Sequence, residues 1–417
     1  MSANPHTRSA VLVLGALFFL FGFTTWINGP LIGYLKIICE LKDGAEPFYV
    51  TFAFYIAYFV TALPMSAVLR RTGMKRGMMY GLFVMAIGAL LFIPAAQARS
   101  YPLFLVGLFV IGTGLSLLQT ASNPYITVVG PIESAASRIS VMGICNKMAG
   151  VLAPIVLGAL LLQDAATLQA DLASLDATAY AAKLDELAAR VILPYGVMAV
   201  VLFGLGLMVL FSPLPELDVE VDEQAGDAPE RGILSYPALM LGVVALFLYV
   251  GGEVMAGDTI GLYGQAQGMP LEETRHLTSY TLACMVVGYI IGIVGVPRWF
   301  TQAQALAFSA VLGVLLTLAA ILLDGVASVY CIAFLGLANA LVWPAIWPLA
   351  IAGLGRHLRT GSAFLIMSIA GGALLPLLYG QLSAMPAVGP QNAYWMMVPC
   401  YLFILWYALK GARFTRW

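Results

Sequence analysis

Long apolar runs alternate with short polar connections along the whole chain. An α-helix needs about 20 mainly apolar residues to cross a bilayer. Runs of this kind lie near 9–35, 47–69, 77–97, 101–128, 138–163, 191–212, 233–264, 277–296, 303–323, 327–355, 359–381 and 392–410. We therefore predict about twelve membrane-spanning segments. We expect them to be helical, because backbone amides in lipid must find hydrogen-bond partners within their own segment.

Two longer polar segments interrupt this pattern and suggest how the chain is divided. Residues 164–190 are mildly amphipathic and predict a helical loop outside the membrane. Residues 213–232 are acidic and bounded by prolines, so they bury too little apolar surface to fold. We predict an N-terminal six-helix bundle at 1–212, an acidic cytoplasmic linker at 213–232 and a C-terminal six-helix bundle at 233–417.

Composition excludes the main soluble classes. Of the 417 residues, 61% are hydrophobic and 10% are charged, against roughly 45–50% and about 25% in soluble proteins. The five cysteines are scattered without a paired spacing, which excludes a disulfide scaffold. The three histidines lie at termini or in loops. We therefore expect no enzyme, no cofactor and no nucleic-acid partner.

The basic residues predict the orientation of the chain. With twelve spans both termini lie on one side, and thirteen lysines and arginines fall there. The opposite side has six: Lys36, Lys42, Arg99, Lys183, Arg190 and Arg275. Because basic residues are enriched in cytoplasmic loops, we predict that both termini are cytoplasmic.

The two predicted bundles contain repeated sequence motifs. The pattern Gln119-x-x-x-Asn123-Pro124 is followed 224 residues later by Trp343-x-x-x-Trp347-Pro348, and Gly112 by Gly336 at the same offset. Parallel repeats of six helices are typical of transporters whose binding site lies between the two halves near the middle of the membrane.

Several stretches also resemble a known family. They are LQTASNPYITVVGPIESAASR at 118–138, the following Asn146, and TTWINGPL in the first helix. With them the chain resembles the major facilitator superfamily, and within it the fucose/glucose/galactose symporters. The superfamily's signature between the second and third helices is reduced here to RRTGMKRG at 70–77, and Arg70 replaces the usual aspartate.

Three charged residues lie inside predicted spans. Glu253 and Asp258 are in the seventh span, and Lys147 is in the fifth. Each charge costs roughly 2.5–3.5 kcal/mol at the centre of a bilayer. They must therefore pair, face a cavity or hold a cation. On an ideal helix the two acids would point about 140° apart, so either the helix is broken between them or they act separately. Nearby glycines would ease such a break.

The resemblance implies a coupling site that this chain does not keep. Proton-coupled fucose permeases have an aspartate after the asparagine of the first helix and a glutamate before the fourth-helix motif. The matching positions here are Gly29 and Gln119, which cannot carry a proton. We hypothesise that Glu253 and Asp258 bind the coupling cation instead, with Lys147 as counter-charge. H⁺ and Na⁺ both remain open, and Na⁺ would make the two acids metal ligands. A permanent ion pair that only joins the halves is the alternative.

Amide and aromatic side chains predict where a sugar would bind. Sugar hydroxyls both donate and accept hydrogen bonds, as amides do, and an indole face suits the C–H face of a pyranose. Simple interhelical bonding and packing are the alternative roles. The candidate sugar ligands are Asn28, Gln119, Asn123, Asn146, Trp343, Trp347 and Tyr55.

These features predict a monomeric secondary transporter of the major facilitator fold in the bacterial inner membrane. We expect it to import a hexose resembling glucose, galactose or mannose, together with H⁺ or Na⁺, by alternating access. The partners are then the sugar, the cation and the lipid bilayer. Glu133 and Arg138 would steady a cytoplasmic gate. An uncoupled facilitator or drug-type exporter, with structural intramembrane charges, is the alternative.

Overall fold

The computed structural model describes residues 5–128, 135–164, 167–212, 214, 232–296, 298–354 and 357–414. The predicted acidic linker at 213–232 lies almost wholly outside these ranges. Within them the regular structure is helical and no strand occurs. In the described part of the chain, twelve helical spans are long and apolar enough to cross a membrane, the number expected from the sequence.

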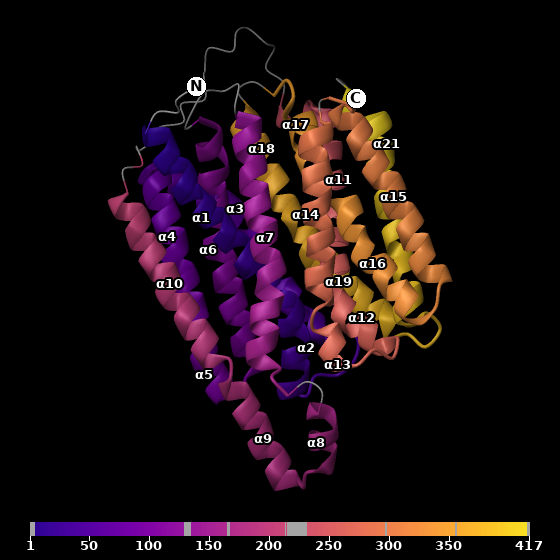
Figure 1. Ribbon diagram of the computed structural model, residues 1–417. Coiled ribbons are helices and arrows are strands. Elements are labelled where there is room, and N and C mark those ends of the chain that lie inside the picture. Colours follow the sequence, from indigo (N-terminus) through magenta and orange to yellow (C-terminus); the bar gives the residue numbers. More distant parts are fainter. Residues whose placement is uncertain are drawn as a thin grey trace.

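The first six spans form the half that begins with α1. The helices of this half are α1 (Pro5–Trp26) and α2 (Asn28–Ile38), α3 (Tyr49–Thr72), α4 (Met74–Leu90) and α5 (Phe92–Gln97), α6 (Tyr101–Val128), α7 (Ala135–Leu161), α8 (Leu168–Ser174), α9 (Ala177–Ala189) and α10 (Ile192–Phe211). A 3₁₀ turn, η1 (Glu46–Phe48), precedes α3. Helices α8 and α9 occupy the segment predicted to be a helical loop, and they project from the bundle at the end opposite the termini (Figure 1).

The second six spans form the other half. The elements of this half are α11 (Pro237–Val254), the π-helical turn η4 (Met255–Thr259) and α12 (Ile260–Ala266), α13 (Leu271–Thr274) and α14 (Leu277–Gly295), α15 (Gln302–Leu322), α16 (Gly325–Asn339) and α17 (Val342–Ile351), α18 (Leu358–Met367), η6 (Ser368–Ala370) and α19 (Gly371–Ser383), and α20 (Gly389–Asn392), η7 (Ala393–Met396) and α21 (Met397–Leu409). Short 3₁₀ turns η3 (Ile233–Ser235) and η8 (Gly411–Arg413) flank this half.

The two halves pack their helices in the same order. In the first half α1 packs on α7, α3 on α6, and α4 on both α6 and α10. In the second half α11 packs on α19, α14 on α16, and α15 on both α16 and α21. Figure 1 shows the two bundles side by side, with α1 beginning and α21 ending at the same end of the molecule. The internal repeat seen in the sequence is therefore a repeat of structure.

Two equivalent glycines explain part of this repeat. A Cβ at Gly112 would lie 2.2 Å from the backbone oxygen of Phe54, and a Cβ at Gly336 would lie 1.9 Å from that of Thr281. Only glycine permits so close an approach between helix backbones. The same close crossing therefore joins the second and fourth spans and the eighth and tenth spans.

The halves meet along α7 with α14 and along α3 with α19. Two hydrogen bonds cross the first contact: Ser279 Oγ donates to the Val151 oxygen at 2.9 Å, and Arg275 Nη1 donates to the Leu162 oxygen at 2.7 Å. Next to the second contact, Phe48 of η1 forms an edge-on ring pair with Tyr379 of α19, with centroids 5.8 Å apart. The two hydrogen bonds and the ring pair lie near the ends of α7 and α19 and the starts of α3 and α14, and α3 also packs on α18 and η6 farther along the interface.

Candidate functional site

A buried ion pair joins the two halves near the middle of α7 and of the seventh span. Lys147 Nζ of α7 lies 2.7 Å from Glu253 Oε1 of α11. Each side chain is only 10% exposed. A charged hydrogen bond of this length is strong. Lys147 therefore pairs with Glu253, and the pair bridges a helix of the first bundle and a helix of the second.

Trp26 adds a second contact to the lysine. Lys147 Nζ lies 4.9 Å from the centroid of the Trp26 ring, within the range of a cation–π interaction. The indole fills the space over two glycines from opposite halves. A Cβ at Gly150 would lie 2.6 Å from Trp26 Cδ1, and a Cβ at Gly257 would lie 2.4 Å from Trp26 Cζ3. The ring thus connects the lysine to the π-helical turn.

Asp258 lies within that π-helical turn and has a different environment from Glu253. It is 1% exposed, and neither of its carboxylate oxygens has a hydrogen-bond partner among the described residues. The seventh span is not an ideal helix between the two acids, because α11 ends at Val254 and η4, which contains Asp258, begins at Met255. The helix geometry therefore changes in this span, which is the first of the two alternatives given by the sequence.

Hydroxyl groups from neighbouring helices hold the π-helical turn in place. Thr278 and Thr281 of α14 donate to the oxygens of Gly257 and Ala256, at 2.7 and 3.2 Å. Within the turn, Thr259 Oγ1 donates to the Met255 oxygen at 2.7 Å, and it also lies 2.8 Å from the Tyr394 hydroxyl. Sequence reasoning did not select Thr278, Thr281 or Tyr394, since each is one hydroxyl among many in apolar helices and only packing distinguishes it.

The predicted amide ligands divide into bonded and unbonded groups. Gln119 Nε2 donates to the Tyr58 hydroxyl at 3.1 Å, and Asn146 Nδ2 donates to the Phe18 oxygen at 3.4 Å. Both bonds join helices of the first half. Asn28 is fully buried, and neither amide atom has a partner among the described residues. The side chain of Asn123 lies outside the part that the structure describes, as do Glu133 and the side chain of Arg138.

The predicted aromatic residues form two groups. Trp343 and Trp347 of α17 stack with ring centroids 5.5 Å apart and planes 24° apart, and both are partly exposed. Tyr249, one turn before Glu253, has its ring centroid 6.5 Å from that of Trp343. Tyr55 of α3 is buried, and its hydroxyl has no partner in the described part of the chain. The tryptophan pair thus lies beside the helix that carries the ion pair.

The structure also shows the surroundings of Gly29 and Gln119, the two positions where the family resemblance implied acids. A Cβ at Gly29 would lie 2.5 Å from Thr278 Oγ1, so a larger side chain would displace the threonine that holds the π-helical turn. The amide of Gln119 is already bound to Tyr58. The described residues contain no group of three or more histidines, cysteines or acids that could hold a metal ion.

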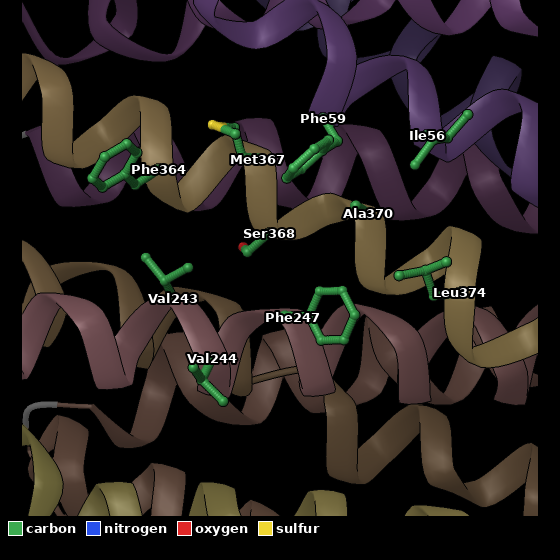
Figure 2. Close-up of a pocket in the computed structure, with 10 residues that line it drawn as sticks. All are labelled: Ile56, Phe59, Val243, Val244, Phe247, Phe364, Met367, Ser368, Ala370 and Leu374. Atoms are coloured by element: carbon green, nitrogen blue, oxygen red, sulfur yellow. The ribbon is translucent and has the colours of Figure 1, made fainter.

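One cavity of about 370 Å³ lies between α3, α11 and the α18–α19 segment. Figure 2 shows Ile56 and Phe59 on the side opposite Val243 and Phe247, with Met367 next to Phe59, and Ser368 is the one polar side chain of the lining. Phe59 is half exposed on the rim. Such a lining offers almost no hydrogen bonds to a hydroxylated ligand. The cavity is therefore distinct from the ion pair and from the polar residues described above.

Comparisons with known proteins agree with this fold. The sequence matches the Major Facilitator Superfamily over residues 14–377. It is 36% identical over 416 residues to the glucose/galactose transporter of Brucella abortus (strain 9-941), covering 99% of this chain and 96% of the relative. It is 28% identical over 392 residues to the L-fucose–proton symporter of Escherichia coli K12, covering 91% and 88%.

Solved structures show the same relationship. A single-residue variant of the E. coli fucose–proton symporter FucP has a TM-score of 0.75 and 25% identity, covering 97% of this chain and 98% of that one. A structure of FucP in the outward conformation has a TM-score of 0.74 at the same identity, covering 96% and 99%. This chain, a multi-pass membrane transporter and not an enzyme, therefore belongs to the Major Facilitator Superfamily.

Proposed function

We propose that this protein imports a neutral hexose, of the glucose or galactose type, together with H⁺. The observation that carries the proposal is the Lys147–Glu253 ion pair between the halves, beside the buried and unpartnered Asp258. Relatives named glucose/galactose transporter and L-fucose–proton symporter support the class of substrate and the type of coupling. We place the protein in the bacterial inner membrane with both termini cytoplasmic, as the distribution of basic residues suggests.

The surroundings of Asp258 favour a proton over Na⁺. An ionised carboxylate without a hydrogen-bond donor is very costly in a site shielded from water. A proton removes that cost without further ligands, whereas Na⁺ would need several oxygens around it. The nearby Thr259 and Thr278 hydroxyls donate to backbone oxygens, so neither supplies a hydrogen bond to an ionised Asp258. A proton therefore fits the site with less rearrangement.

Coupling would work through the contacts of Lys147. With Glu253 ionised, the ion pair holds α7 against α11 and favours the arrangement seen here. Protonation of Glu253 neutralises its carboxylate and weakens that bridge, and the Trp26 ring remains to stabilise the lysine. Movement of one half against the other is then easier, as alternating access requires.

The energetics of such coupling are adequate. One positive charge moving through a potential of about 100 mV supplies roughly 2.3 kcal/mol. At about 1.4 kcal/mol for each factor of ten, this sustains roughly 50-fold accumulation of a neutral sugar. The predicted sugar ligands Gln119, Asn146, Trp343 and Trp347 would line the path, with the stacked indoles against the pyranose ring. Asn123 remains a proposed ligand and Glu133 and Arg138 proposed gate residues.

The test is uptake of radiolabelled glucose and galactose into proteoliposomes with an imposed pH gradient or Na⁺ gradient. We expect accumulation with the pH gradient in wild type, and equilibration without accumulation in Glu253→Gln and Asp258→Asn. Accumulation driven only by Na⁺ would refute proton coupling. Equilibration without accumulation in wild type under both gradients would instead support the facilitator, in which the ion pair is structural.

A further inference from the structure

Unsatisfied polar atoms are concentrated at one place in the described part of the chain. Nine buried side-chain nitrogen and oxygen atoms have no hydrogen-bond partner there, and five of these belong to Asn28, Tyr55 and Asp258. Buried polar groups in folded proteins are normally hydrogen-bonded, and each exception needs an explanation. Five such atoms on three residues indicate a site whose partner is a ligand.

Three elements bring these residues to one level of the molecule. Helix α2, which begins at Asn28, packs against the π-helical turn that contains Asp258. Thr278 fixes this contact, because it lies against Gly29 and donates to the Gly257 oxygen. Tyr55 of α3 packs beside residue Val254 of the same span.

The position of Tyr55 is shown by what surrounds Gly372 of α19. A Cβ at Gly372 would lie 2.9 Å from Val254 Cγ2 and 3.1 Å from Tyr55 Cγ. Tyr55 and Val254 therefore pack over the same glycine. Val254 ends α11 and directly precedes the π-helical turn. The three polar residues come from both halves, two from the first and one from the second.

We propose that Asn28, Tyr55 and Asp258 form a single subsite that binds neighbouring hydroxyls of the transported sugar, with Asp258 contacting the sugar directly. This inference rests on the proposed sugar transport. The three side chains offer an amide donor and acceptor, a phenol and a carboxyl group, which together demand a ligand that both donates and accepts. A vicinal pair of hydroxyls does so, whereas a bare cation would satisfy only the carboxyl, amide and phenol oxygens.

Direct contact would give a simple link between sugar and proton. A protonated Asp258 donates its O–H to a sugar oxygen, and its other oxygen accepts from a sugar hydroxyl. The proton thus removes the buried charge while the sugar satisfies the hydrogen bonds of Asp258, so each ligand improves the site for the other. Because the subsite includes both halves, it is complete only when they are close together.

The test is equilibrium binding of d-glucose, d-galactose and their monodeoxy analogues to the purified protein in lipid nanodiscs. We expect at least one deoxy analogue to bind roughly 10- to 100-fold more weakly than its parent, because the protein atoms that would pair with the missing hydroxyl stay without a hydrogen bond. In Tyr55→Phe, Asn28→Leu or Asp258→Val, the penalty for that analogue should largely disappear. The replaced atoms have no partner within the described part of the protein, so these variants lose no hydrogen bond seen there.

Tyr195→Phe is the matched control. Tyr195 of α10 is another buried tyrosine whose hydroxyl has no partner among the described residues, but it stacks on Phe92 within the first half. Its variant should keep the full deoxy penalty. If wild type binds and accumulates sugar while every penalty is unchanged in all three subsite variants, the atoms are satisfied by water and the subsite is refuted. If wild type binds no hexose, the proposed function itself has failed.

Discussion

Single residues at the site have very different energetic roles. Lys147 and Glu253 compensate each other, and Trp26 adds a face of negative potential to the lysine. Their cost in the membrane is therefore partly offset in this arrangement. Asp258 has no such compensation from the described residues. The sequence located all three charges, because charged residues are rare inside apolar spans, yet it could not choose the partner of Lys147. That choice depends on how α7 and α11 pack.

The ion pair predicts a clear pattern of stability. Lys147→Met removes the ammonium group that pairs with the buried Glu253 carboxylate, and Glu253→Met leaves the buried Lys147 with only the face of the Trp26 ring. Removing one member of a buried pair costs about 3–5 kcal/mol. The double variant removes both charges and should recover most of that loss. Thermal unfolding in detergent, followed by circular dichroism, measures the effect. If the loss of stability in the double variant equals the sum of the losses in the two single variants, the two side chains do not interact.

At the scale of elements, the seventh span contributes both acids of the site, and it changes from an α-helix to a π-helical turn after Val254. The glycines around the acids suggested a weakened helix, and the structure has a π-helical turn at Met255–Thr259. Sequence alone did not reveal that Thr278 and Thr281 of another span hold this turn, or that Trp26 packs on it. Trp26 and Gly257 are more than a hundred positions apart in the sequence, and no local pattern encodes these contacts.

Gly257 is the position where this element is most sensitive. Gly257→Ala places a methyl group 2.4 Å from Trp26 Cζ3, so the indole must move away from the turn and from Lys147. We expect a loss of about 1–3 kcal/mol in stability, as for other overpacked sites, and loss of pH-driven sugar accumulation in proteoliposomes.

Gly252→Ala is the matched control for that variant. It lies in the same span, and its new methyl group would be 3.5 Å from Met397 Cε, an ordinary contact. Alanine also favours a helix over glycine by about 1 kcal/mol. We expect stability and accumulation close to wild type. Equal loss in both variants would mean that the span tolerates no added methyl group, and that Trp26 has no special role.

For the whole molecule, the repeat and the contacts between the halves describe two bundles joined along α7 with α14 and along α3 with α18 and α19. The twelve spans and the twofold repeat were predictable, since apolar length and matching motifs are properties of sequence. The way in which the two halves meet was not predictable, because it depends on contacts between residues that are far apart in the sequence. Among these contacts, Arg275 of the second half donates to the oxygen of Leu162 in the first.

Arg275 therefore stabilises the contact between the halves, and its removal should favour separation of the halves at this contact. A hydrogen bond from a charged group contributes about 1.5–3 kcal/mol, so Arg275→Ala should shift the closed–open equilibrium by roughly tenfold or more. The readout is the labelling rate of Val151→Cys on α7 by a membrane-impermeant thiol reagent from outside, in a background without native cysteines. This substitution keeps the backbone oxygen that accepts from Ser279. Arg190→Ala is the control, because Arg190 binds Leu161, Asp164 and Glu186 within the first half only. Faster labelling in Arg275→Ala alone is expected; equal rates in both would show that this contact does not hold the halves together.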